Sequence, residues 1–313
     1  MAGMHVITPG LLTTVQDRGR WGWQSVGVSV SGAMDPRALR LSNAMVGNGA
    51  DAAALEVTLE GPEVEFEDER RVAVCGAEFS LSIGGRVLPP AEPFAVHAGE
   101  RLRFGSRGRG ARAYLAVTGG FAVPPVFGSR ATHVASGIGG HEGRALRSGD
   151  WVPLGLPARV GAHLGTRAKR LDLMLPDRYA HLRVVLGPQA DRFSQGTLAQ
   201  LTAGRYTVSI NSDRIGYRLE GSTIDAAANW EPLSSPTVIG ALQVPPDGRP
   251  ILLMADRQSI GGYRTIATVI GADIGVAGQL APGDSVSFDI CSRKEALTAL
   301  IAQERALMSC ESP

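Results

Sequence analysis

Short runs in which apolar and polar residues alternate dominate the chain, as in Leu55-Glu-Val-Thr-Leu59, Phe79-Ser-Leu-Ser-Ile83 and Val286-Ser-Phe288. Successive side chains of a β-strand point to opposite faces, so this alternation indicates strands with one buried face. Turns rich in Gly and Pro separate the runs at intervals of about 8–12 residues, as in all-β domains. We therefore predict a mainly β protein built of antiparallel sheets or barrels.

Three segments share one pattern, in which a glycine turn is followed by an acid and an alternating strand. They are His97-Ala-Gly-Glu-Arg-Leu-Arg-Phe104, Arg147-Ser-Gly-Asp-Trp-Val-Pro-Leu154 and Ala281-Pro-Gly-Asp-Ser-Val-Ser-Phe288. Glycine adopts a positive φ at little cost, and the acid can accept hydrogen bonds from nearby backbone N–H groups. Their spread through both halves favours two related sub-barrels, although such turns are common enough to recur by chance.

Helices are predicted in only a few places. Asp35 is a good N-cap, Pro36 suits the first helical position, and Gly47 ends the apolar stripe that follows. A second apolar stripe with helical spacing runs from about residue 293 to 308, and a third, weaker one covers residues 189–201.

The length of the chain predicts two lobes, because a single core seldom grows beyond about 250–300 residues and this chain has 313. Residues 155–181 lose the strand alternation and are rich in Arg, Gly and Ala. We place the boundary there, with an N-terminal lobe at 1–160 and a C-terminal lobe at 161–313.

Composition excludes several classes of protein. A net charge of +1 gives no electrostatic footprint for nucleic acid or an anionic membrane. The N-terminus lacks a signal-peptide pattern and no long apolar run is present, so we expect a cytoplasmic protein. Cys75, Cys291 and Cys310 are odd in number and far apart, which favours reduced, structural thiols.

The lysines and histidines narrow the chemistry further. Lys169 and Lys294 are the only lysines, and neither lies in a phosphate-binding loop, a biotin-attachment motif or an S-x-x-K motif. No biotin is therefore expected on this chain. The six histidines never form H-x-H or H-x-x-x-H, so no metal site is expected either.

Polar residues cluster first in Thr14-Val-Gln-Asp-Arg-Gly-Arg20 and in Ser31-Gly-Ala-Met-Asp35. Gln, Asp and Arg in a glycine-flanked loop can offer an acceptor, a donor and a fixed cation to a small polar substrate. The alternative is structural: Asp35 caps its helix and Asp17 pairs with Arg20.

A second cluster joins three stretches: Asn211-Ser-Asp-Arg-Ile-Gly-Tyr-Arg-Leu219, Gln243-Val-Pro-Pro-Asp-Gly248 and Ala255-Asp-Arg-Gln-Ser-Ile-Gly-Gly-Tyr263. Polar groups at the ends of rigid strands can face a cleft. Structural ion pairs among these residues are the alternative, and we expect them at Arg218 and Asp247 before Asp256 and Gln258.

Taken in order, these blocks resemble the family of the C subunit of bacterial ATP-dependent 5-oxoprolinase. The family includes proteins described as allophanate hydrolase second subunits, as biotin-dependent carboxyltransferase-like, and as KipA, an antagonist of the kinase inhibitor KipI. The resemblance runs from about Val6 to Phe288. It rests on the clusters above together with Pro9-Gly-Leu-Leu-Thr13, Ala54-Leu-Glu56 and Gly187-Pro-Gln189.

This resemblance implies two cyclophilin-like β-barrel lobes that work with a KipI-like B subunit and a LamB/YcsF-like A subunit. The implied reaction opens the lactam of 5-oxo-L-proline to L-glutamate while ATP, bound by this chain or by a partner, is hydrolysed. Two other functions stay open: carboxyltransfer to urea or a related amide from a separate biotinyl protein, and non-enzymatic binding of a KipI-like kinase inhibitor.

The resemblance also assigns residues. It implies catalytic roles for Asp17, Arg214 and Asp256, with Arg214 facing a carboxylate or phosphate and either aspartate accepting a proton. The implied substrate-binding residues are Gln16, Ser31, Asp35, Gln243 and Gln258. Two positions depart from the pattern: Arg264-Thr265 replaces a common Pro-Lys, and Ser235 replaces a common glutamate. These departures put retention of the family substrate in question.

Overall fold

The computed structural model describes residues 2–89, 92–157, 173–225 and 233–311. The chain divides into two compact units. Unit 1 comprises Met1–Arg20, Ser31–Leu175 and Arg305–Pro313, and unit 2 comprises Trp21–Val30 and Pro176–Glu304. The predicted boundary between residues 160 and 161 lies outside the described residues.

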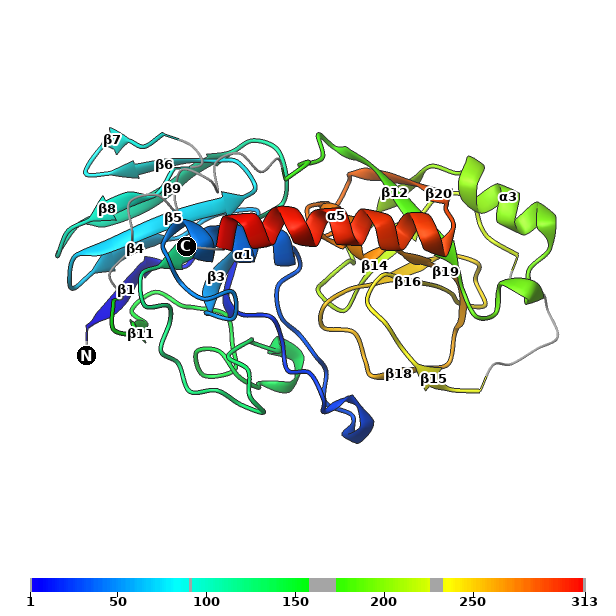
Figure 1. Ribbon diagram of the computed structural model, residues 1–313, viewed down its shortest axis with the longest axis horizontal. Helices are drawn as coiled ribbons and strands as arrows, with labels where there is room; N and C mark the ends of the chain where they lie inside the picture. The colour runs from blue at the N-terminus through cyan, green and yellow to red at the C-terminus, as the bar shows by residue number, and fades with distance from the viewer. Residues whose placement is uncertain (1, 90–91, 158–172, 226–232, 312–313) are drawn as a thin grey trace. The chain divides into compact units, whose positions relative to one another are not determined.

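Unit 1 is built of two antiparallel sheets (Figure 1). The six-stranded sheet has the order β11 (Trp151–Pro153), β1 (Gly3–Thr8), β4 (Glu63–Phe66), β9 (Arg101–Arg107), β6 (Phe79–Ile83), β7 (Arg86–Val87). The five-stranded sheet has the order β2 (Leu12–Gln16), β3 (Ala54–Thr58), β10 (Arg112–Val117), β5 (Arg70–Gly76), β8 (Phe94–Val96). Met4, Leu55, Phe66 and Leu115 share one core cluster, so side chains of both sheets build it.

Helix α1 (Pro36–Met45) packs on β5 and β10 of the five-stranded sheet. The Asp35 side chain accepts hydrogen bonds from the backbone N–H groups of Arg37 (3.1 Å) and Ala38 (3.2 Å), which confirms the predicted cap. Cys75 and Cys310 are buried in the same apolar cluster as the helix. Burial raises the pKa of the Cys75 thiol, with a smaller contribution from the charge of Asp35, as suits a structural thiol.

The three glycine-acid turns predicted from the sequence are structurally alike. Gly99, Gly149 and Gly283 all have positive φ, at 78°, 88° and 87°. In each turn the acid accepts a hydrogen bond from the backbone N–H three residues earlier. These bonds join Glu100 to His97 (2.8 Å), Asp150 to Arg147 (2.7 Å) and Asp284 to Ala281 (2.8 Å). The local prediction is confirmed in both units.

Unit 2 contains a closed barrel (Figure 1). Its strand order is β12 (Tyr179–Leu186), β19 (Arg264–Val269), β16 (Ala241–Val244), β17 (Ile251–Leu253), β14 (Gly216–Glu220), β13 (Tyr206–Val208), β20 (Ser285–Ile290). Leu182, Leu242, Leu252 and Phe288 are fully buried. The prediction of a mainly β chain with barrel architecture is therefore confirmed. A two-stranded ribbon, β15 (Ser235–Pro236) with β18 (Ile260–Gly261), accompanies the barrel.

The other helices are few. The predicted C-terminal helix is α5 (Arg293–Glu311), and α4 (Ile274–Ala277) follows the 3-10 turn η4 (Gly271–Asp273). Residues 189–201 divide into η3 (Ala190–Arg192) and α3 (Gln195–Ala203), because Ser194 caps a new helix through the N–H of Thr197. The remaining 3-10 turns are η1 (Gln24–Val26) and η2 (Val134–Ser136). No helix among the described residues has the length and apolarity to cross a membrane.

Candidate functional site

The outer surface of the unit 2 barrel carries polar side chains in register. In β14, Tyr217 and Leu219 are buried, whereas Arg218 and Glu220 between and beyond them are exposed. Strand pairing aligns Arg218 with Ile251 of β17, and Ile251 with Gln243 of β16. Two strand spacings put the backbones of Arg218 and Gln243 roughly 10 Å apart. The separate sequence blocks thus meet on one face of one sheet.

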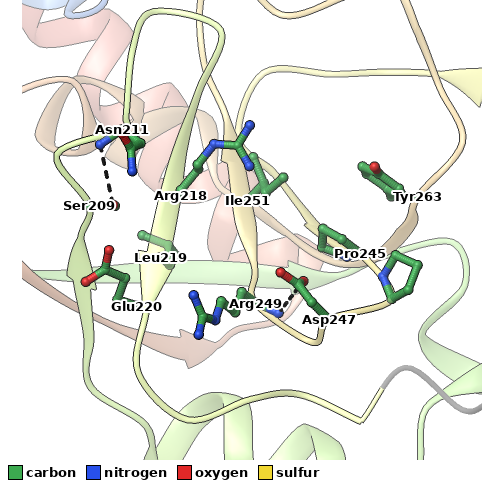
Figure 2. Close-up of a pocket in the computed structure, with 11 residues that line it drawn as sticks. Ser209, Asn211, Arg218, Leu219, Glu220, Pro245, Asp247, Arg249, Ile251 and Tyr263 are labelled. Carbon is green, nitrogen blue, oxygen red and sulfur yellow. Dashed lines mark hydrogen bonds between the residues drawn. The ribbon is translucent and has the colours of Figure 1, made fainter.

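A pocket of about 890 Å³ opens over this face (Figure 2). Its polar lining comes from β14, from the turn before that strand, from the turn after β16, and from the chain just before β19. The polar side chains used below are Asn211, Arg218, Glu220, Asp247, Arg249 and Tyr263. Pockets of about 300–1,000 Å³ are usual for small-molecule ligands.

Two carboxamides converge beside the ribbon. A methyl group placed on Gly261 would lie 2.8 Å from Nε2 of Gln243 and 3.3 Å from Nε2 of Gln258. Gln243 is buried and Gln258 is exposed, so the pair extends from the barrel surface to solvent. A primary carboxamide both donates and accepts hydrogen bonds, so the pair can bind polar groups of either kind.

Both positions that depart from the family pattern adjoin this amide pair. Ser235 pairs directly with Gly261 across the ribbon. Thr265 pairs with Gln243 in the barrel, and its backbone N–H donates to Oε1 of Gln189 (3.1 Å). Ser235 and Thr265 therefore lie next to the amide pair.

Arg214 and Asp256 form a buried, two-pronged ion pair. Nε of Arg214 is 2.9 Å from Oδ2 of Asp256, and Nη2 is 3.1 Å from Oδ1. Each residue is 5% exposed. The sequence favours ion pairs at Arg218 and Asp247 over one at Asp256. The structure has the reverse: the buried Asp256 pairs with Arg214, whereas Arg218 and Asp247 line the pocket. The predicted catalytic roles of Arg214 and Asp256 stay predictions, while their geometry is that of a structural pair.

Arg257, next to this pair, was given no role from the sequence. Its residue exposure is 6%, and Nη1 makes one long hydrogen bond to the carbonyl of Met254 (3.5 Å). Desolvation lowers the pKa of this guanidinium. The only sequence signal for the buried Arg257 is that a cation follows closely after an apolar run.

The predicted residues of the first cluster belong to unit 1. Asp17 accepts hydrogen bonds from the backbone N–H of Gly19 (2.8 Å), from Oγ of Ser129 (2.6 Å) and from the backbone N–H of Arg130 (2.5 Å). Nε2 of Gln16 donates to Oγ1 of Thr14 and to the carbonyl of Thr132, both at 3.0 Å. These side chains hold the strand end to the loop at residues 129–132.

Arg20 contacts the same loop. The sequence offered an Asp17–Arg20 pair as the structural alternative, and these two residues contact the loop separately. Nη2 of Arg20 donates to the carbonyl of Ala131. Asp17 and Arg20 thus bind neighbouring backbone groups of one loop, and proton acceptance by Asp17 stays a prediction.

Ser31 and Asp35 lie in a tightly packed turn. Ser31 has a φ of 56°, and Asp35 caps α1. The backbone N–H of Asp35 donates to the hydroxyl of Tyr114 (2.7 Å), which donates to Oε2 of Glu56 (2.7 Å). Burial, and then the charges of Glu56 and Asp35, raise the pKa of Tyr114. Substrate binding by Ser31 and Asp35 stays a prediction.

Metal-ligand geometry is absent from the described part of the chain, which contains no group of three His, Cys, Asp or Glu side chains that could hold an ion. The unit 2 face carries amides, guanidiniums, carboxylates and a phenol. Such groups bind and orient a polar substrate.

Comparisons with known proteins show the family to which the chain belongs. The family model "carboxyltransferase domain, subdomain A and B" matches residues 26–290. The chain belongs to this family. Within it, the chain is 38% identical to the C subunit of the Escherichia coli 5-oxoprolinase over 303 residues, which is 96% of both chains. It is 34% identical to the C subunit of the Haemophilus influenzae 5-oxoprolinase, covering 90% of this chain and 89% of that one.

A second group of family members has urea as its named substrate. The crystal structure of Kluyveromyces lactis urea carboxylase matches 99% of this chain with a TM-score of 0.90 and 30% identity. This chain spans 29% of that protein. The carboxyltransferase fold is thus shared by relatives that differ in length and in name.

Proposed function

We propose that the chain is the C subunit of an ATP-dependent 5-oxoprolinase and acts with B and A subunits to convert 5-oxo-L-proline to L-glutamate. The observation that carries this proposal is the end-to-end match to proteins named as the C subunit of 5-oxoprolinase, with 96% of both chains aligned to the Escherichia coli protein. The proposed reaction needs all three subunits, so the chain alone should not release glutamate.

The amide pair supports this substrate. Gln243 and Gln258 offer a carbonyl and N–H groups on one face beside Gly261. A lactam carries one N–H and one carbonyl, so a carboxamide can bind both sides of it. In the proposed reaction, ATP phosphorylates the lactam oxygen and releases ADP. Water adds to the activated carbon, the C–N bond breaks and the nitrogen takes up a proton, which leaves an acyl phosphate. A second water hydrolyses this acyl phosphate to the carboxylate and inorganic phosphate.

Reconstitution tests the proposal. The chain is combined with its B and A subunits, and glutamate release from 5-oxo-L-proline is measured with ATP and with a non-hydrolysable ATP analogue. We expect glutamate with ATP and none with the analogue or with any one of the three polypeptides omitted. Absence of turnover from the complete, correctly assembled set rejects the proposal.

A carboxyltransferase acting on urea or a related amide is the second candidate. The fold match to urea carboxylase, with a TM-score of 0.90 over 99% of this chain, favours it. In that case a separate biotinyl protein supplies the carboxyl group. Avidin separates the two functions, because it abolishes carboxyl transfer through biotin and leaves 5-oxoproline cleavage unchanged. A third function, binding of a KipI-like inhibitor without catalysis, predicts full partner binding and no turnover under either set of conditions.

A further inference from the structure

We infer that the outer-face pocket of unit 2 is a binding site for the oxyanion group of a small molecule, held by the guanidinium of Arg218. Nothing in the proposed function assigns this pocket, and the inference concerns binding by this chain alone.

Strand geometry fixes Arg218 over the pocket. The residue lies in β14, where its inward neighbours Tyr217 and Leu219 are 2% and 1% exposed, so its side chain must point outward. The turn before the strand is tied to the same residue, because the N–H of Ser209 donates to the carbonyl of Arg218 (2.9 Å) and the N–H of Arg218 donates to Oγ of Ser212 (3.0 Å). A cation based on a well-anchored strand loses little freedom when it binds a ligand.

The Arg218 guanidinium has no ion-pair or hydrogen-bond partner within the part of the chain that the structure describes. Asn211, in the tied turn, and the phenol of Tyr263 also line the pocket and add neutral hydrogen-bonding groups (Figure 2). An arginine fork with neutral donors nearby matches a carboxylate or phosphate group, which accepts two parallel N–H bonds.

Charge divides the pocket into two ends. Arg249 shares its end with Glu220 and Asp247, whereas Arg218 and Asn211 lie at the other end of the drawn group (Figure 2). The N–H of Leu219 donates to the carbonyl of Pro250 (2.9 Å), which brings the Arg249 turn beside the end of β14 where Glu220 lies. The two carboxylates lower the positive potential at the Arg249 end, so the end at Arg218 suits an oxyanion better.

Volume also limits the ligand. The pocket of about 890 Å³ has room for an organic molecule much larger than a bare phosphate ion. Its neutral or cationic part would lie toward Glu220 and Asp247. The carboxylate of a lactam acid and the phosphates of a nucleotide share this chemistry, and a binding experiment separates them.

The test is calorimetric titration of the full chain, without partners, with 5-oxo-L-proline, its uncharged ring analogue 2-pyrrolidone, and magnesium ATP. We expect saturable binding of at least one charged ligand. Arg218→Gln should weaken it about tenfold or more, since it removes a charge-assisted hydrogen-bonded pair. Arg218→Lys should fall between the two. Arg249→Gln should change binding by less than about threefold, because Arg249 lies at the end of the pocket that also holds Glu220 and Asp247.

Arg293→Gln is the matched control, because Arg293 is an exposed arginine of unit 2 outside the pocket, and it should bind like the wild type. Binding of 5-oxo-L-proline alone identifies a carboxylate site, and binding of magnesium ATP identifies a phosphate site. The inference is overturned if no charged ligand binds, if 2-pyrrolidone binds as tightly as 5-oxo-L-proline and ATP does not bind, or if Arg218→Gln binds like the wild type. Failed turnover in reconstitution with binding intact rejects only the proposed function.

Discussion

The two polar regions of this protein contain the same residue types and use them differently. In unit 1, Gln16 and Asp17 bind backbone groups of a neighbouring loop, and Asp35 caps a helix. In unit 2, Arg218 and Gln258 are exposed beside a pocket and an amide pair. Similar polar clusters in a sequence can therefore stabilise the fold in one place and face a ligand in another.

The two regions differ in what satisfies the hydrogen bonds of their backbone groups. The turns of unit 1 are irregular, and N–H groups such as those of Gly19 and Arg130 need side-chain acceptors. The unit 2 residues lie on or beside barrel strands, whose N–H and carbonyl groups pair with one another. The side chains of Arg218 and Gln258 are left available to a ligand, unlike those of Arg214 and Asp256, which form a buried pair. Four experiments can break or sharpen this contrast.

The largest effect is expected at the buried pair of unit 2. Arg214→Met leaves Asp256 buried without its cation and should lower the free energy of unfolding by about 3–5 kcal/mol. The double variant Arg214→Met/Asp256→Leu should regain most of that loss. Urea unfolding of the wild type and the two variants measures these free energies. Surface substitutions usually change stability by less than about 0.5 kcal/mol, so a single variant within that range would contradict a structural pair.

In unit 1, Asp17→Ala should cost about 2–3 kcal/mol, because it leaves the Ser129 hydroxyl and two backbone N–H groups without their acceptor. Asp51→Ala is the control. The Asp51 side chain is 85% exposed in its contact with Arg18, so its loss should change stability by less than about 0.5 kcal/mol. Equal melting temperatures for the two variants would mean that Asp17 is free for another role.

Gln258→Ala should lower turnover without lowering stability, unlike Asp17→Ala. Gln258 is exposed, so we expect stability within about 0.5 kcal/mol of the wild type. Turnover of the reconstituted complex should fall about tenfold, the worth of one hydrogen bond to a bound substrate. Gln16→Ala, by comparison, should lose stability. If Gln258→Ala keeps full turnover, the amide pair does not bind the substrate.

The smallest effect is a pH dependence at a glycine-acid turn of unit 1. The Arg144 guanidinium, followed by the backbone N–H of Arg147, lowers the pKa of Asp150 to about 2. This pKa lies below the unfolded value of about 3.9, so the stabilisation is complete above about pH 5 and is lost as the pH falls toward 2. Comparing acid unfolding of Asp150→Asn with the wild type should show a difference below about 1 kcal/mol, because the asparagine oxygen still accepts hydrogen bonds from this site. A difference that grows on acidification would contradict this sign.

Local features of the fold were predictable because short-range physics sets them. The cap at Asp35 and the turns at Gly99, Gly149 and Gly283 follow from backbone preferences and side-chain reach. The start of α3 was not predictable at the same level, because Ser194 caps a new helix inside one continuous helical pattern. Propensity alone does not distinguish one helix from two short ones.

The candidate site was predictable in its residue types and not in its geometry. The sequence blocks around Arg214, Gln243 and Asp256 were recognised, yet the expected pairing was reversed. Gln189 illustrates the reason: its contact with the N–H of Thr265 spans 76 residues of sequence. Such partners depend on barrel register, which no local pattern encodes.

The sequence by itself determined that this is a mainly β protein with capped helices and recurrent glycine turns, and it indicated the family to which the chain belongs. The tertiary structure decided which polar side chains form hydrogen bonds with backbone groups and which face the pocket. The physical reason is that alternation and turn chemistry act over a few residues, whereas strand register places Arg218, Ile251 and Gln243 on one surface. Only the folded barrel shows that surface.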